Sequence, residues 1–183
     1  MTCIVGLVDN GNVWIGADSV GVGGFDATDR VDEKVFVRDG LDRMIMGFTW
    51  SFRMGQLLRY KLKIPERPVN MPVPEYMMTH FVDAVRDCLK AGGFAQKNLE
   101  VEQGGVFLVG YAGRLFQMEQ DYQVGERRDG FDACGCGANY ALGSLFSTDP
   151  KSHPRWRVRR ALEAAERFSA GVRRPFKIQE LKA

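Results

Sequence analysis

The sequence has no long apolar run and few of the residues that build metal sites. No stretch approaches the ~18–20 consecutive apolar residues of a membrane-spanning helix. The N-terminus lacks a basic segment followed by a long apolar one, so no signal peptide is expected. The chain has only two histidines and four irregularly spaced cysteines. This pattern favours reduced thiols in a cytoplasmic protein, and it predicts no metal site and no cofactor.

A charge excess of either sign is also missing. The sequence has 25 lysines and arginines against 23 acidic residues, a formal net charge of +2, which gives no global case for binding nucleic acid or a membrane. Basic residues do gather between 151 and 174, but a solvated helix face or a subunit contact explains such a cluster more often than nucleic acid does.

The chain has enough hydrophobic residues to form the core of one domain. It contains 183 residues, of which 45% are hydrophobic, and it shows no repeat, low-complexity tract or linker. Residues 1–183 are therefore expected to form a single domain.

Apolar patterning predicts strands toward both ends of the chain and helices in two pairs. Asn10-Gly11 lies between the first two apolar runs and is a strong hairpin signal, because both turn residues need a positive φ. A segment rich in Gly and Asp, 19–31, is expected to be a loop. The expected strands are 3–8, 13–17, 34–38, 43–48, 105–111, 115–119, 131–135 and 174–181. The expected helices are 54–62, 76–89, 138–146 and 157–168.

Two helix pairs and two groups of strands in one domain predict an α+β fold. The architecture that accommodates them is a four-layer αββα sandwich, in which two antiparallel sheets lie face to face and a helix pair covers each outer surface.

Three residues near the N-terminus suggest a nucleophilic site. If Met1 is removed, Thr2 offers a hydroxyl nucleophile and a free α-amine, whose reference pKa of about 7.7–8.0 suits a base at neutral pH. Asp18 and Lys34 follow Thr2 by 16 and 32 residues. Each alone has an ordinary explanation, a turn residue for Asp18 and a surface lysine for Lys34. Cys3 could replace Thr2 as the nucleophile if two residues were removed.

Several segments, in order, resemble the proteasome β-subunit and HslV-like family of N-terminal-nucleophile (Ntn) hydrolases, nearly end to end. In the first 50 residues these segments are Thr2-Cys3-Ile4-Val5, Gly16-Ala17-Asp18-Ser19, Lys34-Val35 and Met46-Gly47-Phe48. Residues 135–143, GCGANYALG, resemble the family's Gly-Ser-Gly segment that opens a helix. Several motifs in the right order and spacing are far more specific than one alone.

The resemblance implies a role for each matching residue. Thr2 would be the nucleophile and, through its amine, the general base. Lys34 would stabilise the Thr2 alkoxide, and Asp18 would position Lys34. Gly47 would supply a backbone N–H to the oxyanion hole, a donor worth about 3–4 kcal/mol in the transition state. Cys136 stands where the family has a serine beside the threonine amine, and a thiol is the weaker hydrogen-bonding group.

The resemblance also implies a primary specificity pocket near Gly21, Asp32, Met46 and Thr49. In that pocket Asp32 would favour a basic substrate side chain, and Trp50 would narrow or reshape the space. Toward the C-terminus the family's aspartate has no clear counterpart, and Ser169 is an approximate match to the serine that follows it.

Residues and resemblance together favour a cytoplasmic, self-compartmentalising threonine endopeptidase acting on unfolded proteins or peptides. The family's architecture implies a homo-oligomeric double ring of hexamers or heptamers, and it is compatible with a partner AAA+ unfoldase. Two alternatives stay open. One is a proteasome-fold ring protein without peptidase activity, which the substitution at Cys136 and a retained Met1 would favour. The other is an Ntn amidase that uses the same nucleophile on a small molecule.

Overall fold

The computed structural model describes residues 1–98 and 101–183. Its strands, in chain order, are β1 (Cys3–Asp9), β2 (Asn12–Ala17), β3 (Val20–Gly23), β4 (Asp26–Asp29), β5 (Val35–Arg38), β6 (Met44–Phe48), β7 (Gln96–Asn98), β8 (Val101–Gln103), β9 (Phe107–Tyr111), β10 (Arg114–Met118), β11 (Val124–Gly125), β12 (Phe131–Gly135) and β13 (Lys177–Leu181). Its helical segments are α1 (Phe52–Tyr60), α2 (Val73–Tyr76), the π-helical turn η1 (Met77–Phe81), α3 (Val82–Ala91), α4 (Ala138–Ser147) and α5 (Pro154–Phe168).

Two antiparallel sheets form the centre of the molecule. The four-stranded sheet has the order β12-β1-β2-β13, and the five-stranded sheet has the order β11-β10-β9-β6-β5. The β1–β2 turn is the predicted one, with φ of 47° at Asn10 and 79° at Gly11. β1 is an inner strand, paired with β12 on one side and β2 on the other. Thr2, the residue before β1, is therefore attached to a strand that is hydrogen-bonded along both edges.

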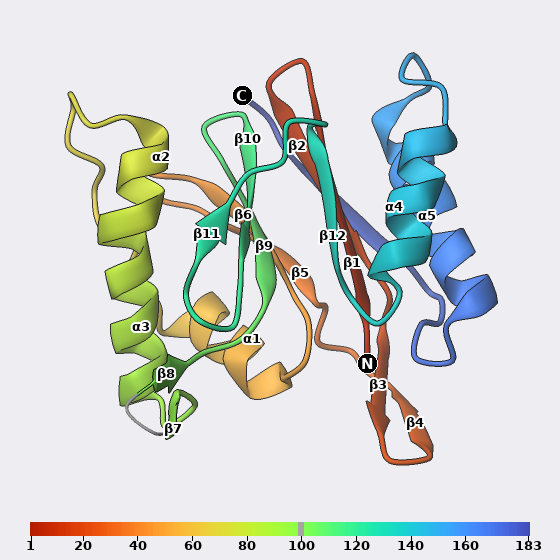
Figure 1. Cartoon of the computed structure of the whole chain (residues 1–183), viewed down its shortest axis with the longest axis horizontal. Coiled ribbons are helices and arrows are strands. Elements are labelled where there is room, and N and C mark those ends of the chain that lie inside the picture. The colour runs from red at the N-terminus through yellow and green to blue at the C-terminus, as the bar shows by residue number, and fades with distance from the viewer. Residues whose placement is uncertain (99–100) are drawn as a thin grey trace.

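Three apolar clusters show how the elements pack. One cluster lies between the sheets and combines side chains of both, among them Ile4, Ile15, Ile45 and Leu108. A second joins the other face of the five-stranded sheet to α1, α2, η1 and α3, and a third joins the four-stranded sheet to α4 and α5. Figure 1 shows the same order, with α3 on one flank, the sheets in the middle and α4 and α5 on the other flank. The fold is mixed α/β with antiparallel sheets. The described residues form four helices, because α2, η1 and α3 run on as one continuous helix beside α1, α4 and α5.

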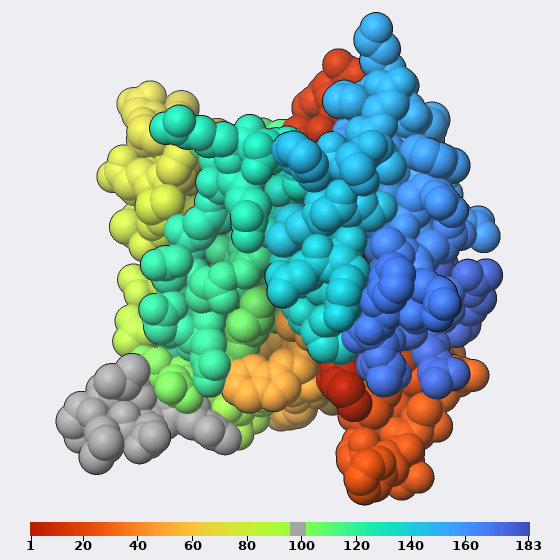
Figure 2. All heavy atoms as spheres, turned by 45° about the vertical axis from the view of Figure 1, so that its right-hand side comes forward, coloured from red at the N-terminus to blue at the C-terminus, as the bar shows by residue number. Residues whose placement is uncertain are grey.

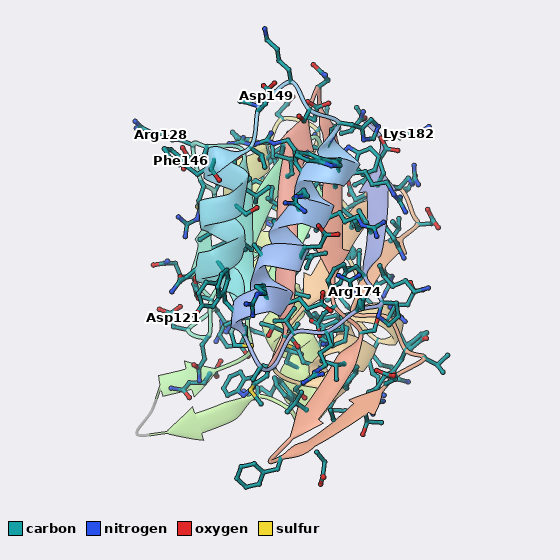
Figure 3. The ribbon with its side chains drawn as sticks, turned by 90° about the vertical axis from the view of Figure 1, so that its right-hand side faces the viewer. Asp121, Arg128, Phe146, Asp149, Arg174 and Lys182 are labelled. Atoms are coloured by element: carbon teal, nitrogen blue, oxygen red, sulfur yellow. The ribbon has the colours of Figure 1, made fainter. Side chains whose placement is uncertain are left out.

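The segment 19–31 is not the loop that its composition predicted. It forms the hairpin β3–β4, in which Val20 pairs with Asp29 and Val22 with Ala27. The turn is made by Gly24, with φ of 60°, and Phe25. Val20 and Val22 alternate with glycine, and this weak period-2 signal is masked by the glycine and aspartate content. The hairpin projects from the body beside the N-terminus of the chain (Figures 1 and 3).

Other differences concern boundaries. Helix α5 begins at Pro154 rather than 157, because His153 caps it by accepting a hydrogen bond at Nδ1 from the Arg155 N–H. Strand β13 begins at Lys177, later than predicted, and β7, β8 and β11 were not predicted. No described helix is long and apolar enough to cross a lipid bilayer.

The tight contact between the sheets generates a stability prediction. A Cβ added at Gly110 in β9 would lie 2.6 Å from Cγ2 of Ile45 and 2.6 Å from Cγ1 of Val13, both branched and stiff side chains. We expect Gly110→Ala to lower the free energy of unfolding by about 1–3 kcal/mol, as overpacking does. Gly125→Ala is the matched control, since no atom lies within 4 Å of its added Cβ. Denaturant unfolding of both variants tests this, and equal stabilities would contradict the described packing.

Candidate active site

Thr2 is held in place by the segment that follows β12. Strand pairing sets Cys3 opposite Gly135, and the Gly137 N–H donates to the Thr2 carbonyl oxygen at 3.4 Å. Gly135 has φ of 96°, and a Cβ there would lie 2.2 Å from that same carbonyl oxygen. Only glycine allows so close an approach of two backbones. Thr2 is 4% exposed, so its side chain has few positions available.

Lys34 reaches the Thr2 hydroxyl from the other sheet. Its Nζ donates to Thr2 Oγ1 at 2.9 Å, to Asp18 Oδ2 at 2.9 Å and to the Val20 carbonyl oxygen at 2.6 Å. These three acceptors match the three donors of an ammonium group. Lys34 lies just before β5, and Asp18 just after β2, so the ion pair links the two sheets at one end.

Asp18 in turn fixes the backbone on both sides of the site. Its Oδ1 accepts from the Cys3 N–H at 2.9 Å and its Oδ2 from the Val20 N–H at 3.2 Å. Burial raises the pKa of the Asp18 carboxyl, and the Lys34 charge and these hydrogen bonds oppose that rise. Burial lowers the pKa of Lys34, and Asp18 opposes that shift. Each partner therefore depends on the other to remain charged.

The Thr2 nitrogen faces a thiol. It lies 3.3 Å from Cys136 Sγ, which also lies 3.4 Å from the Thr2 carbonyl oxygen and 3.2 Å from Ser169 Oγ. The structure thus brings Cys136 to the place that the sequence predicted, and it brings Ser169 there as well. The Cys3 thiol is unsuited to replace Thr2 as nucleophile, because it packs in the apolar cluster beneath α4 and α5, where burial raises its pKa.

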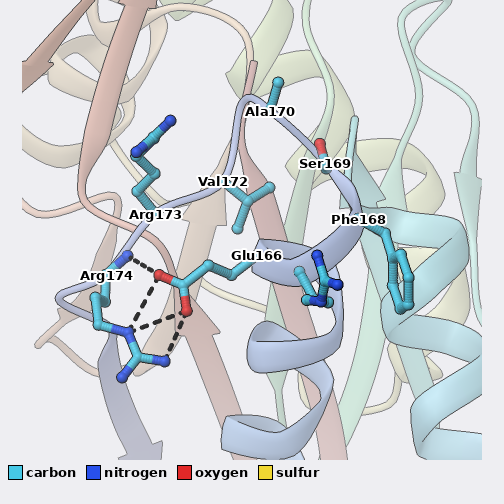
Figure 4. A pocket seen from close by; sticks show the side chains of 8 residues that line it. Glu166, Phe168, Ser169, Ala170, Val172, Arg173 and Arg174 are labelled. Atoms are coloured by element: carbon cyan, nitrogen blue, oxygen red, sulfur yellow. Dashed lines mark hydrogen bonds and ion pairs between the residues drawn. The ribbon is translucent and has the colours of Figure 1, made fainter.

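Ser169 belongs to the loop after α5, shown in Figure 4. Glu166 occupies the region where the sequence offered no clear aspartate. Its carboxylate accepts hydrogen bonds from the Arg174 guanidinium, at 2.7 and 3.0 Å, and from the Arg174 backbone N–H, at 2.9 Å. In Figure 4 the Ser169 hydroxyl points away from this ion pair. Glu166 therefore fastens the loop, while Ser169 contacts the site.

Met1 covers the Thr2 hydroxyl. Its carbonyl oxygen accepts a hydrogen bond from the Thr2 hydroxyl, and its side chain lies beside Gly171 of the same loop. In Figure 2 the dark red end of the chain reaches the surface between that loop and the β3–β4 hairpin. While Met1 is attached, the Thr2 nitrogen is an amide without basic character, so the threonine lacks its own base.

Gly47 is not brought to Thr2, contrary to the prediction that its N–H serves the oxyanion hole. It lies within β6, between β5 and β9, and its Cβ position faces Ile4 and Ile15 in the core. The Thr49 N–H donates to Val106 at the β9 edge of β6, and alternate residues of a strand point the same way, so the Gly47 N–H also faces β9. This glycine allows the sheets to meet.

The loop after β6, Thr49 to Ser51, lies closer to Thr2 than Gly47 does and is the better candidate for an oxyanion donor. Thr49 Oγ1 lies 3.0 Å from the Cβ position of Gly135, the same position that crowds the Thr2 carbonyl oxygen, so the loop passes beside Thr2. Trp50 has φ of 74°, which is strained for a large side chain. The N–H groups of Thr49 and Ser51 are both used, at 3.2 and 2.9 Å, whereas that of Trp50 donates no hydrogen bond within the described part of the chain. In the sequence, the available signal for this donor was the position of Trp50 directly before Ser51, the N-cap of α1.

The predicted pocket residues are distributed unevenly. Asp32 lines a cavity next to Lys34, and the Cβ position of Gly21 lies 3.3 Å from Phe52, which lines the same cavity. Met46 packs in the apolar cluster beneath the helices and is not among the residues that line this cavity, and Thr49 lies at Thr2. Arg30 and Phe52 also line this cavity, and nothing in the sequence pointed to either residue. Among the described residues, no group of three or more His, Cys, Asp or Glu side chains is placed to hold a metal ion.

The fold is shared with proteasome-like proteins. No protein-family model matches this sequence, and no curated protein is detectably similar to it. The solved structure of Thiobacillus denitrificans BPH in complex with epoxomicin is 19% identical, covers 98% of this chain and 98% of its own, and has a TM-score of 0.78. HslV from Trypanosoma brucei is 15% identical, with 99% of each chain covered and a TM-score of 0.69.

A third similar structure is the helical assembly of the Anbu complex from Pseudomonas aeruginosa. It is 16% identical, covers 98% of this chain and 81% of its own, and has a TM-score of 0.66. At these identities the likeness shows the fold alone, which is the proteasome-like Ntn fold of HslV and Anbu.

The buried ion pair generates the next prediction. Lys34→Met leaves Asp18 as an uncompensated buried charge, so we expect it to lower the free energy of unfolding by about 3–5 kcal/mol at pH 7. Adding Asp18→Asn removes the stranded charge and is expected to restore most of that loss. Denaturant unfolding of the wild type, Lys34→Met and the double variant measures both effects.

The pH dependence of that loss has a definite sign. Without Lys34, the pKa of Asp18 rises further above its unfolded value of about 4, so the folded state holds the proton more tightly than the unfolded state. Stability relative to the wild type therefore recovers as the pH falls toward 4 and is lost as the pH rises. The double variant lacks the titrating group and should show no such recovery. A deficit that is independent of pH in Lys34→Met would contradict the buried carboxylate.

Proposed function

We propose that this protein is a threonine-type peptidase of the proteasome-like Ntn hydrolase family, a single-domain αββα sandwich. The observation that carries the proposal is the geometry around one hydroxyl. Thr2 Oγ1 receives a hydrogen bond of 2.9 Å from a buried lysine, which is itself paired with a buried aspartate. A buried cation placed on a hydroxyl favours its alkoxide form, and it is hard to explain by packing alone.

In the proposed reaction, removal of Met1 gives Thr2 a free α-amine. This amine accepts the hydroxyl proton while Oγ1 attacks the carbonyl carbon of a peptide bond. Lys34 stabilises the developing alkoxide. The Trp50 N–H, which has no acceptor among the described residues, replaces Gly47 as the candidate donor to the oxyanion. The leaving amine takes the proton from the Thr2 ammonium. Water, activated by the same amine, then hydrolyses the resulting ester.

Asp18 and Cys136 would act on the orientation of these groups. Asp18 holds Lys34 on the hydroxyl and holds the Cys3 N–H beside it. The Cys136 sulfur and, beyond it, the Ser169 hydroxyl lie on the nitrogen side of Thr2 and would orient the amine. The site needs no metal in this scheme.

Assembly is part of the proposal. The similar fold of Anbu occurs in a helical assembly, which supports a homo-oligomer for this chain. We propose a double ring of hexamers or heptamers in the cytoplasm that encloses the Thr2 sites, acts on unfolded proteins or peptides and works with an AAA+ unfoldase. The alternative is a ring of the same fold without activity, which the contact of the Thr2 hydroxyl with the Met1 carbonyl favours if Met1 is retained.

Intact mass of the purified protein, before and after incubation with epoxomicin, tests the chemistry. Epoxomicin combines a ketone and an epoxide, so it reacts fully only with a residue that carries both a hydroxyl and a free amine. We expect a chain that lacks Met1 and gains the mass of one inhibitor. Thr2→Ser should still be labelled, and Thr2→Ala should be neither labelled nor able to cleave peptides. Peptidase activity that survives in Thr2→Ala would defeat the proposal, and a retained Met1 without labelling would favour the inactive ring.

The thiol beside the amine generates a separate prediction. Replacing Cys136 by serine strengthens the hydrogen bond to the Thr2 nitrogen, whereas alanine removes it. A hydrogen bond of about 0.5–1.5 kcal/mol corresponds to a factor of roughly two to ten. We therefore expect the rate of epoxomicin labelling to fall by that factor in Cys136→Ala and to be kept or raised in Cys136→Ser. Equal rates in all three proteins would show that Cys136 does not orient the amine.

A further inference from the structure

A cavity of about 250 Å³ is lined by Phe52, a neighbour of the Lys34 ammonium. Its walls include two aromatic rings, Phe48 and Phe52, with Gly55 between them and the charged side chains of Arg30, Asp32 and Arg59 around the rim. Drug-sized ligands occupy larger pockets, of about 300–1,000 Å³, so the volume suits a single amino-acid side chain.

Phe52 connects the cavity to the candidate active site. Its ring centroid lies 5.8 Å from Lys34 Nζ, and Lys34 Nζ is 2.9 Å from the Thr2 hydroxyl. The backbone of Gly21 approaches the same ring, since a Cβ at Gly21 would lie 3.3 Å from it. A peptide whose carbonyl carbon sits at Thr2 therefore has one aromatic ring between its reacting bond and this cavity.

The charges at the rim are already paired. Arg30 makes a two-pronged ion pair with Asp32, at 2.7 and 2.8 Å, and the hydrogen bond from Arg30 lowers the pKa of that carboxyl. The Arg30 guanidinium also lies over the Phe52 ring, 4.0 Å from its centroid. Arg59 donates to the backbone carbonyl oxygens of Glu33 and Val35, at 2.6 and 3.2 Å.

Glu33 completes this pairing, because its carboxylate contacts Lys177 at 3.2 Å and Gln179 at 3.0 Å. The cavity thus offers an aromatic surface in which Arg30, Asp32 and Glu33 are ion-paired and Arg59 is held by backbone carbonyl oxygens. Both oxygens of Asp32 accept from Arg30, so a basic substrate side chain would have to compete with Arg30 for this carboxylate.

We propose that Arg30 determines the specificity of this site. By occupying Asp32 and stacking on Phe52, it makes the cavity select an apolar or aromatic side chain on the residue before the cleaved bond. A basic side chain in the same place would meet the Arg30 charge and find no free carboxylate. This inference rests on the proposed peptidase function and deepens it.

The test uses Arg30→Met, which keeps an unbranched side chain over Phe52 and removes the charge. Fluorogenic peptides that differ only in the residue before the cleaved bond, leucine, phenylalanine or arginine, give kcat/KM for each protein. The wild type should prefer leucine and phenylalanine to arginine. In Arg30→Met, the ratio of arginine to leucine cleavage should rise at least tenfold, because Asp32 becomes free. Adding Asp32→Asn should cancel the rise, and Arg53→Met, an exposed α1 residue outside the cavity lining, should not change the ratio.

Epoxomicin labelling of each variant separates the two possible failures. A wild type that is labelled and cleaves best after arginine, or an Arg30→Met variant that is labelled with an unchanged ratio, would overturn the role of Arg30 and leave the peptidase standing. A wild type that is neither labelled nor active would remove the peptidase, and the specificity inference with it. Thermal unfolding of Arg30→Met shows whether the variant is folded.

Discussion

The ion pair between Lys34 and Asp18 is the interaction on which this structure depends. Both side chains are almost fully buried, and burying two charges costs free energy that their attraction repays only when every donor and acceptor is matched. Here the matching is complete for the ammonium, with three acceptors, one of which is the Thr2 hydroxyl. A pair of this kind adds little to stability, but it fixes position strictly, since any displacement exposes an unpaired charge to an apolar interior. Thr2 is therefore positioned by the same contacts that keep the two sheets in register at this end.

The chemistry is divided between the two sheets. The four-stranded sheet contributes Thr2 ahead of β1 and, after β12, the segment that contains Cys136, while the five-stranded sheet contributes Lys34 ahead of β5. The two sheets meet through glycines such as Gly47 and Gly110, whose missing side chains let β-branched residues of the facing sheet come close. The short distance from Lys34 to Thr2 is thus a consequence of close packing between the sheets.

Much of this arrangement was readable in the sequence. The paired strands and the helices follow from periodicity, which local physics dictates. The grouping of Thr2, Asp18 and Lys34 was implied by the resemblance to proteasome-like proteins. The donor to the proposed oxyanion could not be predicted from the sequence. The direction of the Gly47 N–H depends on which strand lies on each side of β6, and strand order is a long-range property. Arg30 was missed because a glycine-rich segment that was expected to be a loop gave no reason to place its side chain on Phe52. The strained Trp50 illustrates the same point, since a positive φ at tryptophan has no composition signal.

The position of β1 in its sheet has a consequence for biosynthesis. Thr2 precedes β1, but β1 is flanked on one side by β12, about 130 residues later along the chain. The Thr2 nitrogen also faces a sulfur from the segment after β12. The loop that contains Ser169 emerges later still. Contacts so distant along the chain form slowly and only after most of the polypeptide has left the ribosome. In the proposed peptidase, a nascent chain would therefore carry Thr2 without the groups that activate it, and an unfinished chain would be inactive without any separate inhibitor.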